Sequence, residues 1–305
     1  MRKVLGSYRN GNYMVTICDD GTKIRMNNED ELIAAFPESI DMKISNRCNM
    51  GCPQCHEQSV PDGALANLRH PLLDSLHPYT ELALGGGNVF EHPDLDNFLF
   101  RMAEKKIICN ITVHAHHFIQ YFSNIQYHVD HGTLHGIGVS VNEPIGDGFI
   151  SYLKLIPNVV VHVIAGVVPW ETLVKLSNNN IKLLILGYKT FGRGIQYWCN
   201  NKEDVTAEIV HLKERLPYLF KHFPVVSFDN LALEQLEVKN MVDDKTWERS
   251  YMGDDGKYTM YIDLVKEEFA TSSISPRKPI HSNNIDELFK EVQNGIYKLP
   301  RMRWQ

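Results

Sequence analysis

From about residue 39 the chain repeats one pattern: a short apolar run, a polar or glycine-containing loop, and a helix-like segment. The apolar runs cover residues 39–45, 80–87, 109–116, 135–142, 159–168 and 181–189. Strands that alternate with helices form parallel βαβ units, and a run as apolar as VVVHVIAGVV suits a strand covered on both faces. Six units are too few for a closed eight-stranded barrel. We therefore expect an α/β fold, a partial (β/α)6 TIM-like barrel of parallel strands.

The segments on either side of this pattern predict smaller additions. Residues 13–26 predict a β-hairpin that turns at Asp20 and Gly21, and residues 27–36 predict a short helix capped by Asn27 or Asn28. Residues 253–265 predict a turn and an exposed edge strand, and residues 285–296 a terminal helix. We expect three regions: an N-terminal β-hairpin and helix at 1–38, the barrel core at 39–200, and a C-terminal α+β extension at 201–305 that closes the barrel.

Bulk properties exclude some classes of partner. The chain has 305 residues, a formal net charge of −6 and no long Lys/Arg run, which makes a nucleic-acid partner an unfavourable hypothesis. Its first residues contain no apolar stretch long enough for a signal peptide. No run of about 18 apolar residues occurs either. We expect a cytoplasmic protein without a membrane partner, in which thiols stay reduced.

Three of the six cysteines lie within eight residues, in the spacing CxxxCxxC: Cys48, Cys52 and Cys55. Random placement of cysteines would give this spacing roughly 0.002 times in such a chain. Thiolates suit Zn²⁺ or iron–sulfur clusters, but a closed zinc site needs a fourth ligand. His56 is a poor fourth ligand because adjacent residues rarely both reach one ion. Three thiolates on a four-iron cluster would leave one iron open.

This motif, on a loop directly after an apolar strand, resembles that of the radical S-adenosylmethionine (SAM) superfamily, and the resemblance covers most of residues 39–190. It implies that the three cysteines hold a [4Fe–4S] cluster whose open iron binds the amino and carboxylate groups of SAM. It also implies reductive cleavage of SAM to a 5′-deoxyadenosyl radical, with an electron donor such as flavodoxin or ferredoxin. A non-enzymatic zinc-binding interaction module is the alternative.

Further segments resemble the SAM-binding motifs of that superfamily. Gly86 and Gly87 match the glycines of its Gly-Gly-Glu-Pro element, where Asn88 replaces the acid and loses the charge. The strand end 139–142 resembles its Ser-x-Asp/Asn element, and the run 163–167 its adenine-contacting strand. The position before the third cysteine is often aromatic in the superfamily and is Gln54 here. The resemblance therefore assigns SAM contacts to Gln54, Gly86, Gly87, Asn88, Ser140, Asn142, Ile164 and Gly166.

Barrel enzymes place their chemistry at the C-terminal ends of the strands, so polar residues there are substrate candidates. They are His114, His116, Tyr188, Lys189, Arg193 and Asp229. His114 and His116 share a face if their strand persists, although such pairs more often line a pocket or lie on the surface. Lys189 and Arg193 could bind a carboxylate or phosphate, or belong to an ordinary basic loop.

The substrate class stays open between a peptide, a nucleotide and a metabolite, and no residue is assigned a catalytic role. Only Cys199 lies beyond residue 109 among the cysteines. An auxiliary iron–sulfur cluster in the C-terminal third is therefore not expected.

Overall fold

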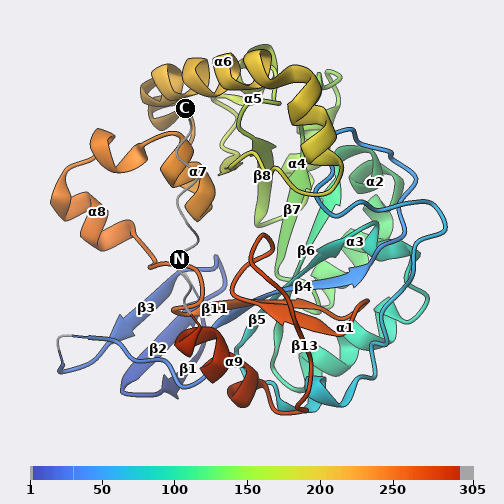
Figure 1. Ribbon diagram of the computed structural model, residues 1–305, viewed down its shortest axis with the longest axis vertical. Helices are drawn as coiled ribbons and strands as arrows, with labels where there is room; N and C mark the ends of the chain where they lie inside the picture. Colours follow the sequence, from blue (N-terminus) through green and yellow to red (C-terminus); the bar gives the residue numbers. More distant parts are fainter. Residues whose placement is uncertain (1–2, 30, 296–305) are drawn as a thin grey trace.

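A computed structural model describes residues 3–29 and 31–295 of the chain (Figure 1). Its main sheet follows the order β10-β9-β8-β7-β6-β5-β4-β11-β12-β13. Parallel pairing joins β4 (Ser39–Ser45), β5 (Glu81–Gly86), β6 (Ile108–His114), β7 (Gly136–Ser140), β8 (Val159–Ile164), β9 (Lys182–Leu186) and β10 (Val226–Phe228). The strand β11 (Thr259–Asp263) is parallel to β4, and β12 (Glu268–Ala270) and β13 (Lys278–Pro279) continue antiparallel.

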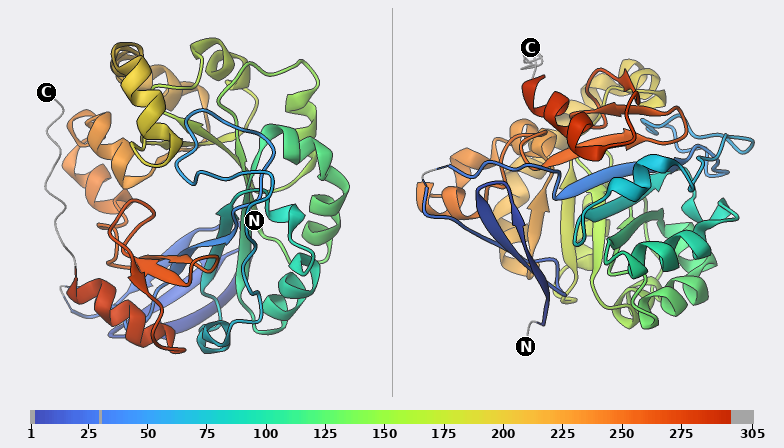
Figure 2. Two further views of the ribbon diagram at one scale, coloured as in Figure 1. Left: turned by 45° about the vertical axis from the view of Figure 1, so that its right-hand side comes forward. Right: turned by 90° about the horizontal axis from the view of Figure 1, so that it is seen from below.

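The expected fold class is confirmed: the six predicted runs are strands β4 to β9 of a partial barrel, and β10 and β13 end the described sheet unpaired with each other. Helices lie outside the curved sheet (Figure 2, left). They are α1 (Leu95–Glu104), α2 (Ala115–Gln120), α3 (Phe122–Asp130), α4 (Phe149–Leu155), α5 (Trp170–Leu176), α6 (Arg193–His222), α7 (Asn230–Gln235), α8 (Asp244–Ser250) and α9 (Ile285–Asn294), with short 3-10 turns η1 (Pro71–Ser75), η2 (Val89–Glu91) and η3 (Val238–Met241). Residue 296 of the predicted last helix lies outside the described residues. None of the described helices has the length and apolarity that a membrane crossing requires.

The N-terminal hairpin is also confirmed, as β2 (Tyr13–Cys18) and β3 (Lys23–Met26), and β1 (Val4–Asn10) adds a third antiparallel strand. The predicted helix at 27–36 is wrong for the described residues 27–29 and 31–36. Asn10 accepts hydrogen bonds from the backbone N–H groups of Ala35 and Phe36, and Asn12 accepts one from Ile33. These side chains, at the turn between β1 and β2, bind the backbone groups that a helix would use, and so keep the segment non-helical.

The prediction that residues 253–265 end in an exposed edge strand is wrong as well. Strand β11 lies between β4 and β12, and Met260 and Ile262 are almost completely buried. The later strand β12 covers the side of β11 that the local pattern left open. The inward side chain of Asp263, in β11, is 3.7 Å from the Lys43 ammonium. This ion pair explains why an interior strand carries a charged residue.

Alternation along the strands separates the core from the barrel lumen. In β4, Ile40, Met42 and Ile44 are fully buried on the helix side, while Asp41 and Lys43 project from the other face because successive side chains point to opposite sides. Partner strands keep the same register, with Tyr261 beside Asp41 and Asp263 beside Lys43. The lumen wall therefore carries polar and charged groups.

The lower half of the lumen holds a cavity of about 260 Å³ between the strands and the N-terminal hairpin. Figure 2 (right) shows the hairpin at the end of the barrel opposite the loop that follows β4. His162 lines this cavity and lies against Gly138, where an added Cβ would come within 2.3 Å of the imidazole. Burial lowers the pKa of His162 to about 4. The ring is therefore neutral at physiological pH.

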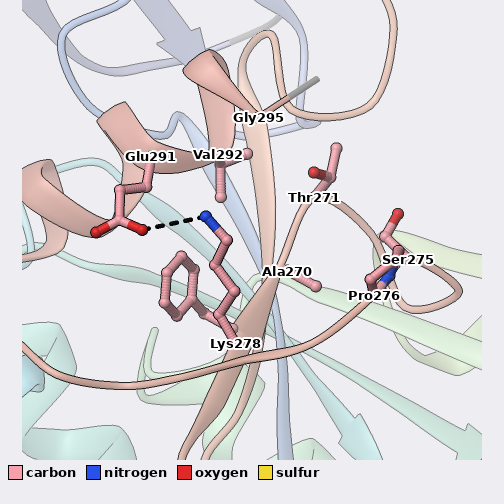
Figure 3. A pocket seen from close by; sticks show the side chains of 9 residues that line it. Ala270, Thr271, Ser275, Pro276, Lys278, Glu291, Val292 and Gly295 are labelled. Carbon is pink, nitrogen blue, oxygen red and sulfur yellow. Dashed lines mark hydrogen bonds and ion pairs between the residues drawn. The ribbon is translucent and has the colours of Figure 1, made fainter. Parts of the chain in front are cut away.

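A second cavity, of about 60 Å³, lies among β12, β13 and α9 (Figure 3). Lys278 and Glu291 form an ion pair of 3.2 Å at its edge. None of the residues predicted for the functional site lines it.

The neutral His162 should make the fold sensitive to acid. Its pKa is depressed in the folded chain, so the unfolded chain binds the extra proton first, and stability falls as pH drops from about 6.5 towards 4. By this linkage the group costs about 2 kcal/mol of unfolding free energy between pH 7 and pH 5. Urea unfolding of the metal-free chain at both pH values should show a smaller loss for His162→Gln than for wild type. An identical loss in both would contradict the assignment.

Candidate functional site

The three clustered cysteines lie on the loop after β4, which crosses the mouth of the barrel (Figure 2, left). The loop is folded back on itself, because the N–H of Asn46 donates to Ala64 O and that of Cys48 to Val60 O. All three thiols are unpaired and half-buried. They share one short segment in which Cys55 N–H donates to Cys52 O over 3.2 Å.

The thiols interact electrostatically. Burial raises the pKa of Cys48 and Cys52, and the charge of Cys55 raises both further, whereas Arg193 lowers them. Three thiols on one loop fit an iron–sulfur cluster in donor type.

Within the described residues, no three His, Cys, Asp or Glu side chains gather closely enough to hold a single metal ion. A tetrahedral zinc ion with Zn–S bonds of about 2.3 Å would need its sulfurs about 4 Å apart. Thiolates as a donor type suit both zinc and iron–sulfur clusters.

The end of β5 packs directly on this loop. The N–H groups of Gly87 and Asn88 donate to Ser45 O and Arg47 O, both over 2.7 Å. A Cβ on Gly86 would lie 2.3 Å from Ser45 O, and one on Gly87 would lie 2.2 Å from Arg47 O. The neighbouring Gly85 has nothing within 4 Å of its Cβ position, so it faces open space.

The remaining predicted SAM contacts lie at the ends of β5, β7 and β8. Asn88 is buried and caps η2, with Oδ1 accepting from the Phe90 N–H. Asn142 Oδ1 accepts from the Ile164 N–H over 2.7 Å and so joins two strand ends. Ser140 ends β7 and is half-buried. Gly166 adopts φ +79° against α6, where a Cβ would lie 2.7 Å from Val205. No contact in the structure tests these residues against SAM, and their roles stay predictions.

The predicted substrate loop after β9 is brought against the cysteine loop. The Arg193 guanidinium donates from Nε to Cys52 O over 3.0 Å and from Nη1 to Ser59 O over 2.8 Å. The buried Tyr188 donates its hydroxyl to Gly194 O, and burial raises its pKa to about 12. Gln54 lies beside the same turn, with its backbone carbonyl oxygen 3.4 Å from the Cβ position of Gly194.

The other substrate candidates lie around the barrel mouth. Lys189 Nζ donates to Ser273 Oγ over 2.9 Å, and Asp229 caps α7 by accepting from the Ala232 and Gly187 N–H groups. The strand containing His114 does not persist, because α2 begins at the next residue. His114 caps that helix and is half-buried, while His116 is exposed. Whether any of these residues meets a substrate is not tested by the structure.

The sequence reasoning missed His117. Its side chain is buried, and Nε2 donates to Asn49 Oδ1 over 3.1 Å, next to Cys48. Burial lowers the pKa of His117 to about 4. A neutral imidazole therefore holds the start of the motif. Its position one turn into a helix gave no local signal.

A buried ion-pair network behind the third cysteine was also missed. Glu57 is 2.8 Å from the Lys43 ammonium and 3.2 Å from His56 Nε2, and it accepts from the Tyr261 hydroxyl over 3.3 Å. Burial alone would raise the pKa of Glu57, but His56 and Lys43 outweigh it and hold that pKa well below its usual range. The network ties the loop to β4 and to the C-terminal strand β11.

Asp41 is the third missed residue. Its carboxyl is accessible to water yet enclosed within the lumen, and burial raises its pKa to about 6, with Lys189 lowering it and Asp255 and Asp229 raising it. No hydrogen bond to its side chain occurs among residues 3–29 and 31–295. A carboxyl with a pKa near neutrality can take up a proton or accept a hydrogen bond from a bound molecule.

The fold matches solved structures, although no family model and no curated protein matches the sequence. It is similar to crystal structures of Streptococcus suis SuiB. The structure bound to the precursor peptide SuiA gives a TM-score of 0.64 at 13% identity, over 97% of this chain and 90% of that chain. The structure bound to S-adenosylmethionine gives 0.60 at 13% identity over the same shares. At this identity the likeness shows a common fold across nearly the whole length of both chains.

The glycines at the end of β5 permit a sharp test of the packing. We expect Gly86→Ala and Gly87→Ala each to lower the free energy of unfolding by about 1–3 kcal/mol, because the new methyl overlaps the backbone of the cysteine loop. Gly85→Ala is the matched control and should change it by no more than about 0.5 kcal/mol. Urea unfolding of the three variants measures the free energy of unfolding. Equal stability of all three would contradict the close packing of the end of β5 against the cysteine loop.

Proposed function

We propose that this chain is a radical SAM enzyme in which Cys48, Cys52 and Cys55 hold one [4Fe–4S] cluster. The observation that carries the proposal is the position of the CxxxCxxC motif. It lies on the loop over the mouth of a partial barrel whose fold is that of SuiB, a protein solved with S-adenosylmethionine bound. The glycine-bearing end of β5, packed against this loop, supports the same assignment.

A [4Fe–4S] cluster held by Cys48, Cys52 and Cys55 would supply the electron for reductive cleavage of SAM, the chemistry that generates a 5′-deoxyadenosyl radical for hydrogen abstraction from a substrate. The residues of the chain orient the reactants for this chemistry. Gly86 and Gly87 bring backbone carbonyls to the methionyl end of SAM, and Ser140 and Asn142 offer polar groups at the end of β7. The lumen below receives the substrate and separates it from bulk water, which suits a reactive radical.

We propose a peptide as the substrate. SuiB, solved with a precursor peptide, matches this chain over 97% of its length, so the elements that surround the mouth of the barrel have counterparts. The mouth carries a cation, Lys189, and the lumen a carboxyl, Asp41, which together suit the mixed polar groups of a peptide. A flavodoxin- or ferredoxin-type protein is the proposed electron donor.

The metal content and the SAM reaction test the proposal together. Anaerobically reconstituted protein should hold about four iron and four sulfide per chain and, with strong reductant, release 5′-deoxyadenosine slowly without substrate. Cys52→Ala should lose the cluster, whereas Cys199→Ala, at an exposed cysteine outside the motif, should keep it. One zinc per chain and no 5′-deoxyadenosine would instead identify the zinc-binding module.

Release of 5′-deoxyadenosine should rise when the correct peptide is added. Peptides encoded by short reading frames beside this gene are the first to assay. A rise with a nucleotide or metabolite, and none with such peptides, would reject the peptide substrate while leaving the radical reaction in place.

Asp41 should matter for the coupled reaction only. A lost hydrogen bond to a charged group costs about 1.5–3 kcal/mol, so Asp41→Asn should lower peptide-dependent turnover roughly tenfold or more. Peptide-independent SAM cleavage should persist. Because the carboxylate is the accepting form, the wild-type coupled rate should rise with pH through about 6, and the variant should lose this limb. Asp244→Asn, at an exposed position of α8, is the control. Equal coupled rates and pH profiles in wild type and Asp41→Asn would remove Asp41 from the site.

A further inference from the structure

One residue at the start of α6 holds three carbonyl groups of the cysteine loop. The backbone N–H of Arg193 donates to Cys55 O over 3.0 Å. Its Nε donates to Cys52 O over 3.0 Å, and its Nη1 to Ser59 O over 2.8 Å. The contacts span both cysteines of the CxxC half of the motif and the residues that lead out of it. Arg193 therefore fixes the course of the loop from Cys52 to Ser59.

Glycines on both sides allow this close approach. Gly192 adopts φ +55°, and an added Cβ would lie 2.4 Å from His56 O. A Cβ on Gly194 would lie 2.4 Å from Lys189 O and 3.4 Å from Gln54 O. The turn is held from behind by the Tyr188 hydroxyl, which donates to Gly194 O. The start of α6 is thus pressed against the loop by contacts that leave no room for side chains.

The guanidinium also brings a positive charge that its hydrogen-bond partners do not neutralise. Both acceptors are neutral carbonyls, and among the described residues no carboxylate lies within 4.0 Å of Arg193. The N-terminus of α6 adds the partial positive charge of the helix dipole. Both contributions favour negative charge on the cysteine loop.

We propose that Arg193 is a positioning residue for the iron–sulfur cluster: its guanidinium fork, which donates to Cys52 O and Ser59 O, fixes the cysteine loop, and its uncompensated charge favours the reduced cluster. The inference rests on the proposed function. In the reduction, one electron passes from the flavodoxin- or ferredoxin-type donor, which is oxidised, to the cluster, which is reduced. No bond is formed and no proton is transferred. The reduced cluster carries one more negative charge, so a nearby cation raises the reduction potential, which depends on local charge and hydrogen bonds.

The test uses reconstituted wild type, Arg193→Gln, Arg193→Lys and the control Arg215→Gln, which removes a cation further along α6 that lies over Trp170. Iron and sulfide content, the EPR spectrum of the reduced cluster and the midpoint potential are measured on each. Arg193→Gln should lower the ratio of reduced to oxidised cluster about tenfold at a fixed donor potential, equal to about 59 mV for one electron. Arg193→Lys keeps the charge but not the fork. The ratio of reduced to oxidised cluster in this variant should stay within about threefold of the wild-type ratio, while the EPR spectrum changes.

Each outcome decides a separate point. A wild-type potential and spectrum in Arg193→Gln at full iron loading would overturn the inference and leave the proposed function standing. Absence of iron from the wild type would overturn the proposed function. If Arg193→Gln binds no cluster, Arg193→Lys decides: iron loading with a near wild-type potential supports the role of the charge. Loss of the folded circular dichroism spectrum in both variants would overturn the inference, because Arg193 would then be a general folding residue.

Discussion

The cysteine loop depends on backbone contact from its two neighbours. It contains almost no regular secondary structure, so its N–H and C=O groups must find partners outside a helix or ladder. The end of β5 supplies some of them through Gly87, whose N–H donates to Ser45 O, and the start of α6 supplies others through Arg193. Glycine is required at both contacts because a Cβ would overlap the loop backbone. The position of the three thiols follows from these contacts with the end of β5 and the start of α6.

The sequence predicts the barrel well because its signals are local. Apolar runs separated by helical segments predict β4 to β9 to within a few residues at either end. The two errors come from contacts that are distant in sequence. The helix expected at 27–36 is replaced by an irregular segment because Asn10 and Asn12, at the turn between β1 and β2, bind its backbone. Strand β11 becomes interior because β12 forms after it and pairs with it.

The candidate site likewise contains residues that the sequence predicts and residues that it does not. The three cysteines follow from spacing alone, because their ligand geometry is set within eight residues. The residues that hold the loop do not, because their partners are remote: Tyr261 and Glu57 are 204 positions apart in the sequence and meet only in the folded chain. Arg193 is an instructive case. Its chemistry, a guanidinium fork for oxygen acceptors, is visible in the sequence, but the structure shows that carbonyls of the loop occupy that fork.

The charged residues of the lumen limit which functional groups a substrate can present to it. The Asp229 carboxylate accepts from the Ala232 N–H as the cap of α7, Asp255 accepts from Asn230, and Lys189 donates to Ser273. Asp41 alone of these four has no hydrogen-bond partner among the described residues. Burial raises the pKa of Asp41 to about 6, and the nearby acids Asp255 and Asp229 add to the shift, so that Asp41 is mostly ionised at neutral pH at an energetic cost. A bound amide N–H or ammonium group would relieve this cost, whereas a second anion would increase it. The lumen therefore favours a substrate that presents a hydrogen-bond donor to β4, and a peptide backbone or lysine side chain has that chemistry.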